Sequence, residues 1–246
     1  MHKIIIFLFF NILLTSKLHA LIEVDITRGN LDPLPIAISP LHVDIKSEQY
    51  KDLKIKDLGI NMSKIIENNF RTTGLFNPLK KEAFVQKPDI AHLKPRFEDW
   101  RLIKAQALVT GKLLIKDEKL KVEFRLWDLT ASKEKTGLAF TTTPANWRRV
   151  AHMISDKIYE RLTGENGYFD TRIIYVAESG PKNQRVKKLA IMDQDGFNTK
   201  YLTRGTELVL TPRFNPTNQM VTYMSYFRNQ PRVYLLDIET GEQDVV

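Results

Sequence analysis

The chain has 246 residues, 43% of them hydrophobic, so it has room for one large or two modest domains with a buried core. It has no cysteine, which excludes disulfides, thiolate nucleophiles and cysteine-based zinc or iron–sulfur sites. The 37 basic and 29 acidic residues give a net charge of +8, but they are interspersed, which indicates a solvated surface rather than a nucleic-acid-binding one.

The N-terminus has the layout of a secretory signal peptide. Lys3 supplies a short positive region, residues 4–14 are almost entirely apolar, and a more polar stretch ends at Ala20. This pattern predicts a signal peptide over residues 1–20, cleaved between Ala20 and Leu21, and therefore an exported protein. The alternative is a membrane anchor, but the apolar run is well short of the ~20 residues that span a bilayer.

The expected mature chain begins with a segment that alternates between apolar and polar side chains, which predicts a half-buried strand. Its residues are Ile22, Glu23, Val24, Asp25, Ile26 and Thr27. One interpretation is an edge strand of the protein's own sheet. The other is a detachable strand that pairs with the sheet edge of a partner, because a terminal strand is held by few contacts. The alternation alone favours the edge strand.

The next segments predict a strand followed by helices. Residues 33–41 form a short apolar run framed by prolines, which predicts a strand. Residues 58–73 predict a helix, and residues 97–103 a second, shorter one. Asn77-Pro78 is typical of a turn. The apolar face of the first helix contains Leu58, Met62, Ile65, Ile66 and Phe70.

Three strands, over residues 107–115, 121–128 and 136–143, are joined by short polar turns and predict an antiparallel meander. Thr143-Pro144 then predicts the start of a helix with Thr143 as its N-cap, and Gly164 its end. The apolar stripe of this helix comprises Trp147, Val150, Ala151, Ile154, Ile158 and Leu162. The fold class is therefore α+β, a sheet with packed helices over residues 21–165, followed by an inter-domain linker over residues 166–171.

Beyond the linker the pattern changes to strands alone. Strands are predicted over residues 172–177 and 188–193, with a third starting at Tyr201, and the pattern recurs over residues 219–225 and 232–237. A repeat of about 40–45 residues built from short strands is typical of a β-propeller blade. Residues 172–246 therefore predict the first one to two blades of an incomplete β-propeller with WD40-like repeats.

No catalytic or cofactor motif is found. The sequence contains no Gly-x-Ser-x-Gly nucleophile motif, and its five histidines include no pair at metal-ligand spacing. Thr110-Gly111-Lys112 lacks the rest of a phosphate-binding loop, and residues 193–196 lack the final glutamate of a calcium loop. We therefore expect no enzyme activity, no cofactor, no metal and no small-molecule substrate.

Several stretches resemble the TolB family, periplasmic proteins of the Tol–Pal system. The most specific are Trp147-Arg148-Arg149-Val150-Ala151-His152 and residues 161–173, supported by Phe124-Arg125-Leu126-Trp127-Asp128. Residues 211–216 are similar to the family's linker before a blade, with Asn215 where the family usually carries Ser. The resemblance runs from about Glu23 to Val246.

The resemblance implies a function in protein–protein interaction. The family pairs an α/β N-terminal domain with a six-bladed propeller and is not enzymatic. Its N-terminal strand contacts TolA of the inner membrane, and its propeller binds Pal, an outer-membrane lipoprotein. These contacts link the envelope layers, notably during division, and hold the protein peripherally in the periplasm. Carried over by position, the TolA-contacting segment is Ile22 to Thr27, which now favours the detachable strand.

The end of the sequence departs from the family. Residues 172–246 make less than two blades, whereas a propeller closes with at least about four. We therefore expect a fragment or a truncated gene product whose Pal binding is impaired. Two alternatives remain: the non-catalytic, propeller-bearing front part of an exported hydrolase, and a periplasmic ligand binder.

Overall fold

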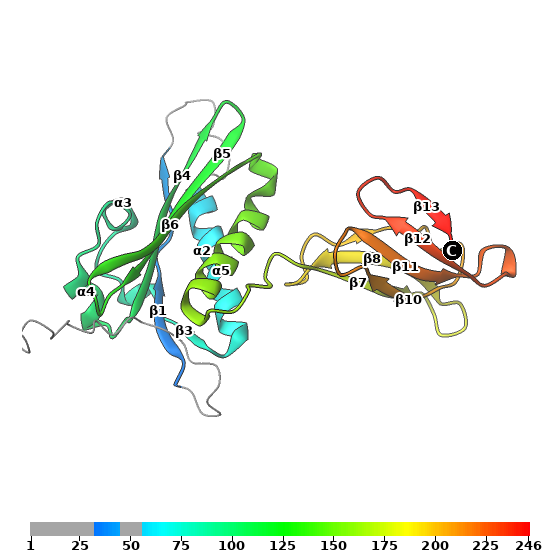
Figure 1. The fold of residues 1–246 in the computed structure, drawn as a ribbon, viewed down its shortest axis with the longest axis horizontal. Helices are drawn as coiled ribbons and strands as arrows, with labels where there is room; N and C mark the ends of the chain where they lie inside the picture. Colours follow the sequence, from blue (N-terminus) through cyan, green and yellow to red (C-terminus); the bar gives the residue numbers. More distant parts are fainter. Residues whose placement is uncertain (1–31, 45–55) are drawn as a thin grey trace, which may run out of the picture. The chain divides into compact units, whose positions relative to one another are not determined.

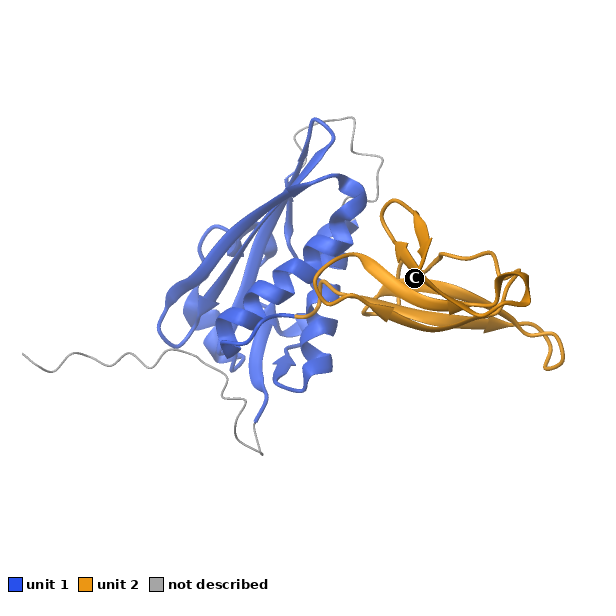
Figure 2. Cartoon of the chain, turned by 45° about the vertical axis from the view of Figure 1, so that its right-hand side comes forward, with its two compact units in different colours: residues 1–167 blue, residues 168–246 orange. Residues whose placement is uncertain are grey.

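The computed structural model describes residues 32–44 and 56–246, which form two compact units (Figure 1; Figure 2). The first unit comprises Met1–Gly167 and the second Tyr168–Val246. The predicted signal peptide and the predicted strand over residues 22–27 lie outside the described residues. No helix in the described part of the chain is long and apolar enough to cross a membrane.

The first unit is built on a mixed sheet whose strands are ordered β3-β1-β4-β5-β6, with β2 also paired to β4. The predicted meander is confirmed, because β4, β5 and β6 are antiparallel neighbours. β1 and β2 both run parallel to β4, one after the other along the same edge. The strands are β1 (Leu34–Ile38), β2 (His42–Asp44), β3 (Phe76–Pro78), β4 (Ala107–Lys116), β5 (Lys119–Asp128) and β6 (Lys133–Thr142).

One face of this sheet is covered by α2 (Lys56–Thr73) and α5 (Trp147–Thr163) (Figure 1). Both are amphipathic, as the three- and four-residue spacing of their apolar side chains predicts. The α2 residues Met62, Ile66 and Phe70 are fully buried, and so are the α5 residues Ala151, Ile154 and Ile158. Gly164 ends α5 with a φ of 79°, a left-handed conformation that glycine adopts without strain.

The opposite face is covered by short segments, with α3 (Pro88–Ala91) and α4 (Phe97–Leu102) on that side (Figure 1). They follow a single 3₁₀ turn, η2 (Lys81–Ala83). The α4 residue Trp100 is 1% exposed and packs in one cluster with Leu108 and Trp127 of the sheet. The sheet therefore has a core on both faces.

Two local predictions in the first unit are wrong. Asn77 and Pro78, predicted as a turn, belong to β3 and pair with β1. Proline is tolerated there because β3 is at the edge of the sheet formed by the described residues, where the missing N–H costs no ladder bond. Thr143 makes no side-chain cap, because a 3₁₀ turn, η3 (Pro144–Asn146), comes between it and the start of α5 at Trp147.

The second unit consists of two open antiparallel sheets, and the predicted incomplete propeller is confirmed. Leu189 of one sheet packs with Val209, Tyr223, Tyr234 and Leu236 of the other to form the core. The first sheet holds β7 (Arg172–Ser179), β8 (Val186–Asp193) and β9 (Lys200–Tyr201). The second holds, in chain order, β10 (Val209–Phe214), β11 (Met220–Ser225), β12 (Arg232–Asp237) and β13 (Gln243–Val245). A 3₁₀ turn, η4 (Phe227–Asn229), lies between β11 and β12.

The turns after β8 and β12 share an aspartate at the strand end and a glycine in the turn. Asp193 and Asp237 are the last residues of these strands, and each is followed by a glycine with positive φ, Gly196 at 86° and Gly241 at 79°. The Asp237 carboxylate accepts hydrogen bonds from two backbone N–H groups, those of Glu239 and Thr240. The hydrogen bond from Thr240 is the largest cause that lowers the pKa of Asp237, and the bond from Glu239 is the next. The charged carboxylate of Asp237 therefore stabilises this turn.

Most of the stretch predicted as a linker before the second blade is instead a strand. Residues 211–214 belong to β10, which pairs with β11 across an irregularity between Leu210 and Arg213. Thr211, within this irregularity, has a φ of 48°. The break in the ladder explains why the sequence lacks clean alternation here.

Candidate protein-interaction surfaces

The predicted partner-binding residues, Ile22 to Thr27, and the predicted cleavage site at Ala20 and Leu21 lie outside the described residues. The described chain starts at Asp32 and enters β1, whose residues Ile36 and Ala37 are fully buried between β3 and β4. The described part of the first unit therefore begins next to a firmly packed strand inside the sheet.

The sheet of the first unit ends in β3 and β6, and each has one strand neighbour among the described residues. β6 is ten residues long and largely exposed, so it presents backbone groups to which another strand can pair. Charged residues near its start, including Lys133 and Glu134, and a register shift opposite Leu126 and Trp127 oppose indiscriminate pairing.

A strip of ion pairs lies across β4 and β5. Glu123 accepts from Lys121 at 2.7 Å and lies 3.5 Å from Lys112. The hydrogen bond from Lys121 is the main cause that lowers the pKa of Glu123. These side chains are partly exposed, so the strip is a modest stabiliser and no site of proton transfer.

His42 and His92 stack in parallel, with ring centroids 4.5 Å apart and an interplanar angle of 6°. The Nδ1 of His92 donates to the carbonyl of Pro88 at 3.0 Å. Stacking brings the two rings together through their faces, so their nitrogen lone pairs do not converge on a common point. The pair is therefore a packing contact, not an acid–base couple or a chelate.

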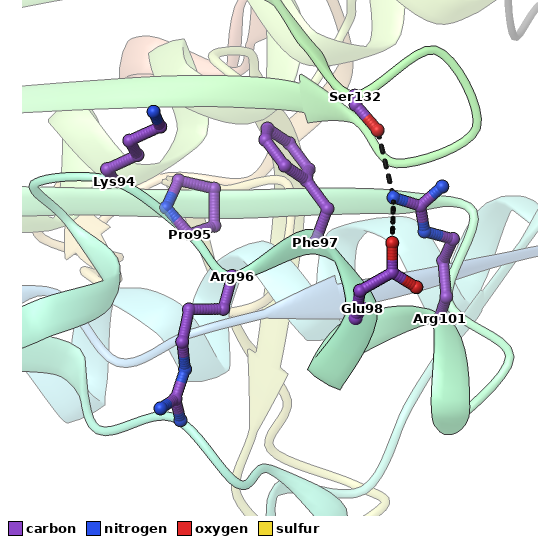
Figure 3. A pocket seen from close by; sticks show the side chains of 7 residues that line it. All are labelled: Lys94, Pro95, Arg96, Phe97, Glu98, Arg101 and Ser132. Atoms are coloured by element: carbon purple, nitrogen blue, oxygen red, sulfur yellow. Dashed lines mark hydrogen bonds and ion pairs between the residues drawn. The ribbon is translucent and has the colours of Figure 1, made fainter.

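A hollow of about 440 Å³ lies beside α4 (Figure 3). The Phe97 side chain lies between Lys94 on one side and the Arg101–Ser132 pair on the other (Figure 3). Arg101 Nη2 donates to Ser132 Oγ at 2.9 Å and lies 3.0 Å from Glu98 Oε1. The hollow thus combines an apolar floor with cationic walls, which suits the binding of a polar ligand and provides no nucleophile–base pair.

The buried amide of Gln86 fixes the loop that carries Lys94 and Arg96. Its Oε1 accepts from the Arg96 backbone N–H at 2.9 Å and from the Trp100 indole N–H at 3.0 Å. Its Nε2 donates to the Lys94 carbonyl at 3.3 Å. One side chain that is 3% exposed therefore ties the hollow's loop to the core of its layer.

The second unit has a hollow of about 520 Å³, lined among others by Arg204, Glu207, Tyr223 and Gln243. The Tyr223 hydroxyl donates to Gln243 Oε1 at 2.9 Å. Burial, then the nearby Tyr234 and Glu207, raises the pKa of Tyr223, so its hydroxyl remains a hydrogen-bond donor. This polar lining can bind a partner but contains no activated group.

Sequence reasoning missed both hollows and the role of Gln86. The only available signal was the interleaving of Lys94, Arg96 and Arg101 with Phe97, and a run of this kind is common on solvated surfaces. Which residues share a hollow depends on non-periodic loop geometry.

Comparison with known proteins gives matches over both units. Residues 22–135 match the TolB amino-terminal domain, and residues 159–246 match the TolB beta propeller domain. The Tol-Pal system protein TolB of Pelagibacter ubique (strain HTCC1062) is 72% identical over 237 residues, which are 96% of this chain and 53% of that protein.

The crystal structure of TolB from Acinetobacter baumannii superposes with a TM-score of 0.71 at 24% identity, covering 89% of this chain and 50% of that one. This second match shows a shared fold. The chain spans about half the length of both relatives. Because two TolB domains match residues 22–135 and 159–246, and a TolB relative is 72% identical over nearly the whole chain, the chain belongs to the TolB family.

Proposed function

We propose that this protein is a periplasmic interaction component of the Tol–Pal system. In this role it links TolA of the inner membrane to the outer-membrane lipoprotein Pal, and so supports outer-membrane integrity and invagination during division. The observation that carries the proposal is the 72% identity to a Tol-Pal system protein over 237 residues. The signal-peptide pattern of residues 1–20 supports export to the periplasm.

Residues Ile22 to Thr27 are the proposed TolA-binding segment. Their alternation gives one apolar and one polar face, as required of a strand that adds to a partner's sheet. We expect deletion of residues 21–28 to abolish binding to the TolA C-terminal domain in calorimetric titration. The urea unfolding midpoint of the first unit, measured on the same deletion, shows whether a loss of binding is accompanied by a loss of stability. Unchanged affinity for TolA would rule out the assignment.

Binding of Pal is proposed for the propeller of the whole protein, and the two sheets of the second unit supply part of that propeller. We expect residues 1–246 to bind Pal at least about tenfold more weakly than the longer Pelagibacter relative, a difference of about 1.4 kcal/mol. Equal affinities would place the Pal contacts within the 246 residues. The exported-hydrolase alternative gains no support from the family matches.

A further inference from the structure

The layer formed by residues 79–105 exposes apolar side chains to an unusual degree. It buries Trp100 against the sheet but turns Val85, Ile90, Leu93 and Leu102 outward, at 64, 53, 70 and 81% exposure. These are the four most exposed large apolar side chains among the described residues of the first unit. Scattered single cases are ordinary, but four in one small layer single this layer out as the place to search for a binding surface.

Positive charge accompanies these apolar side chains. Lys94 forms no ion pair with any residue that the structure describes, and it borders the hollow opposite Arg101 (Figure 3). Arg101 is held by Ser132 and Glu98, so its position is set before any ligand arrives. Between these two cations the Phe97 ring offers an apolar contact, fixed from below by its edge-on packing against Trp127.

The loop that carries these groups is preorganised. Gln86 holds both the Lys94 carbonyl and the Arg96 N–H. A loop fixed in this way loses little conformational entropy when it binds a partner. The same contacts therefore give a higher affinity than they would on a flexible loop.

From this arrangement we propose that the hollow beside α4 and the apolar residues around it form a docking surface for an acidic segment of a partner protein. A large apolar side chain of the partner packs on Phe97, and carboxylates on either side of it pair with Lys94 and Arg101. Leu93 and Leu102, next to these cations in the chain, extend the apolar contact.

An anionic lipid surface fits the same cations less well. The Phe97 ring in the hollow offers an apolar contact that a large side chain of a protein segment fills and lipid headgroups do not use. A concave hollow also favours a discrete side chain over a flat array of headgroups. The observations therefore favour a protein segment.

The test uses the full chain and the peptide acetyl-EEDWDEE-amide, whose tryptophan supplies the apolar group. The matched neutral peptide is acetyl-QQNWNQQ-amide. We expect the acidic peptide to bind at least about fivefold more tightly than the neutral one, and its affinity to fall as salt is raised.

Lys94→Glu should lower the affinity for the acidic peptide by about tenfold or more, and Leu93→Ser should lower it by about threefold. The control is Lys64→Glu, the same charge change at an exposed residue of α2 on the other side of the sheet, which should alter affinity less than about twofold. All three positions are exposed, so the variants should fold, as circular dichroism would verify.

The proposal is overturned if the two peptides bind alike or not at all, or if Lys64→Glu weakens binding as much as Lys94→Glu. It is also overturned if vesicles of phosphatidylglycerol and phosphatidylethanolamine bind the chain through Lys94 in place of the peptide. Binding of the acidic peptide that depends on Lys94 and Leu93 but not on Lys64 supports it.

Discussion

The role of Gln86 predicts a large stability loss from a single substitution, Gln86→Leu. The change removes the hydrogen bonds to Lys94, Arg96 and Trp100. At roughly 1 kcal/mol net for each bond the loss is about 3 kcal/mol, and burial of the apolar leucine recovers about 1 kcal/mol. We therefore expect the free energy of unfolding to fall by about 2 kcal/mol.

Urea titration followed by tryptophan fluorescence measures this loss, because Trp100 and Trp127 pack in the cluster that Gln86 supports. With a slope of about 2 kcal/mol per molar urea, the midpoint should fall by about 1 M. The matched control is Lys87→Leu, which places the same side chain at the exposed neighbouring position and should change stability by less than about 0.5 kcal/mol. An unchanged midpoint for Gln86→Leu, or an equal fall for Lys87→Leu, would refute the reasoning.

Three further outcomes are expected. Gly59→Ala should lower the thermal midpoint despite alanine's helix preference, with a loss above about 2 kcal/mol, because the new Cβ would collide with the Leu41 carbonyl oxygen. Glu123→Gln should cost under about 1 kcal/mol in urea titrations at pH 7. Because the pKa of Glu123 is lowered, its carboxylate stabilises the fold above about pH 4 and ceases to do so as pH falls through the folded-state pKa. The difference in unfolding free energy between the original protein and Glu123→Gln should therefore vanish in acid. In hydrogen exchange, amides of β12 should exchange faster than those of β5, whose sheet is packed on both faces, and similar rates would contradict this.

The sequence predicts best where burial imposes a period. In β5, Val122, Phe124 and Leu126 alternate and are all buried, since one face of that strand meets the helices. The end of α5 was equally predictable, because the helix ends in a left-handed residue and Gly164 adopts that conformation without strain. The blade repeat was visible because both turns begin at an aspartate and contain a glycine with positive φ.

Prediction failed where tertiary contacts override local pattern. Pro78 reads locally as a turn, yet the edge of the sheet accepts it as a strand residue in β3. β10 was missed because its ladder is interrupted at Thr211, where φ is positive. Gln86 gave no signal because its importance depends on three partners that only the folded loop brings within reach.

The two proposed binding regions of the first unit make separable demands on the fold. The segment Ile22 to Thr27 precedes β1 in the chain, whereas the docking surface depends on Gln86 and α4. If they bind different partners, deletion of residues 21–28 and Lys94→Glu should act additively on each affinity. If they bind two parts of one partner, the second contact becomes intramolecular once the first has formed, so each change alone weakens binding of that partner and the losses from the two changes do not add. A double-mutant cycle on TolA binding therefore distinguishes a single extended interface from two independent ones.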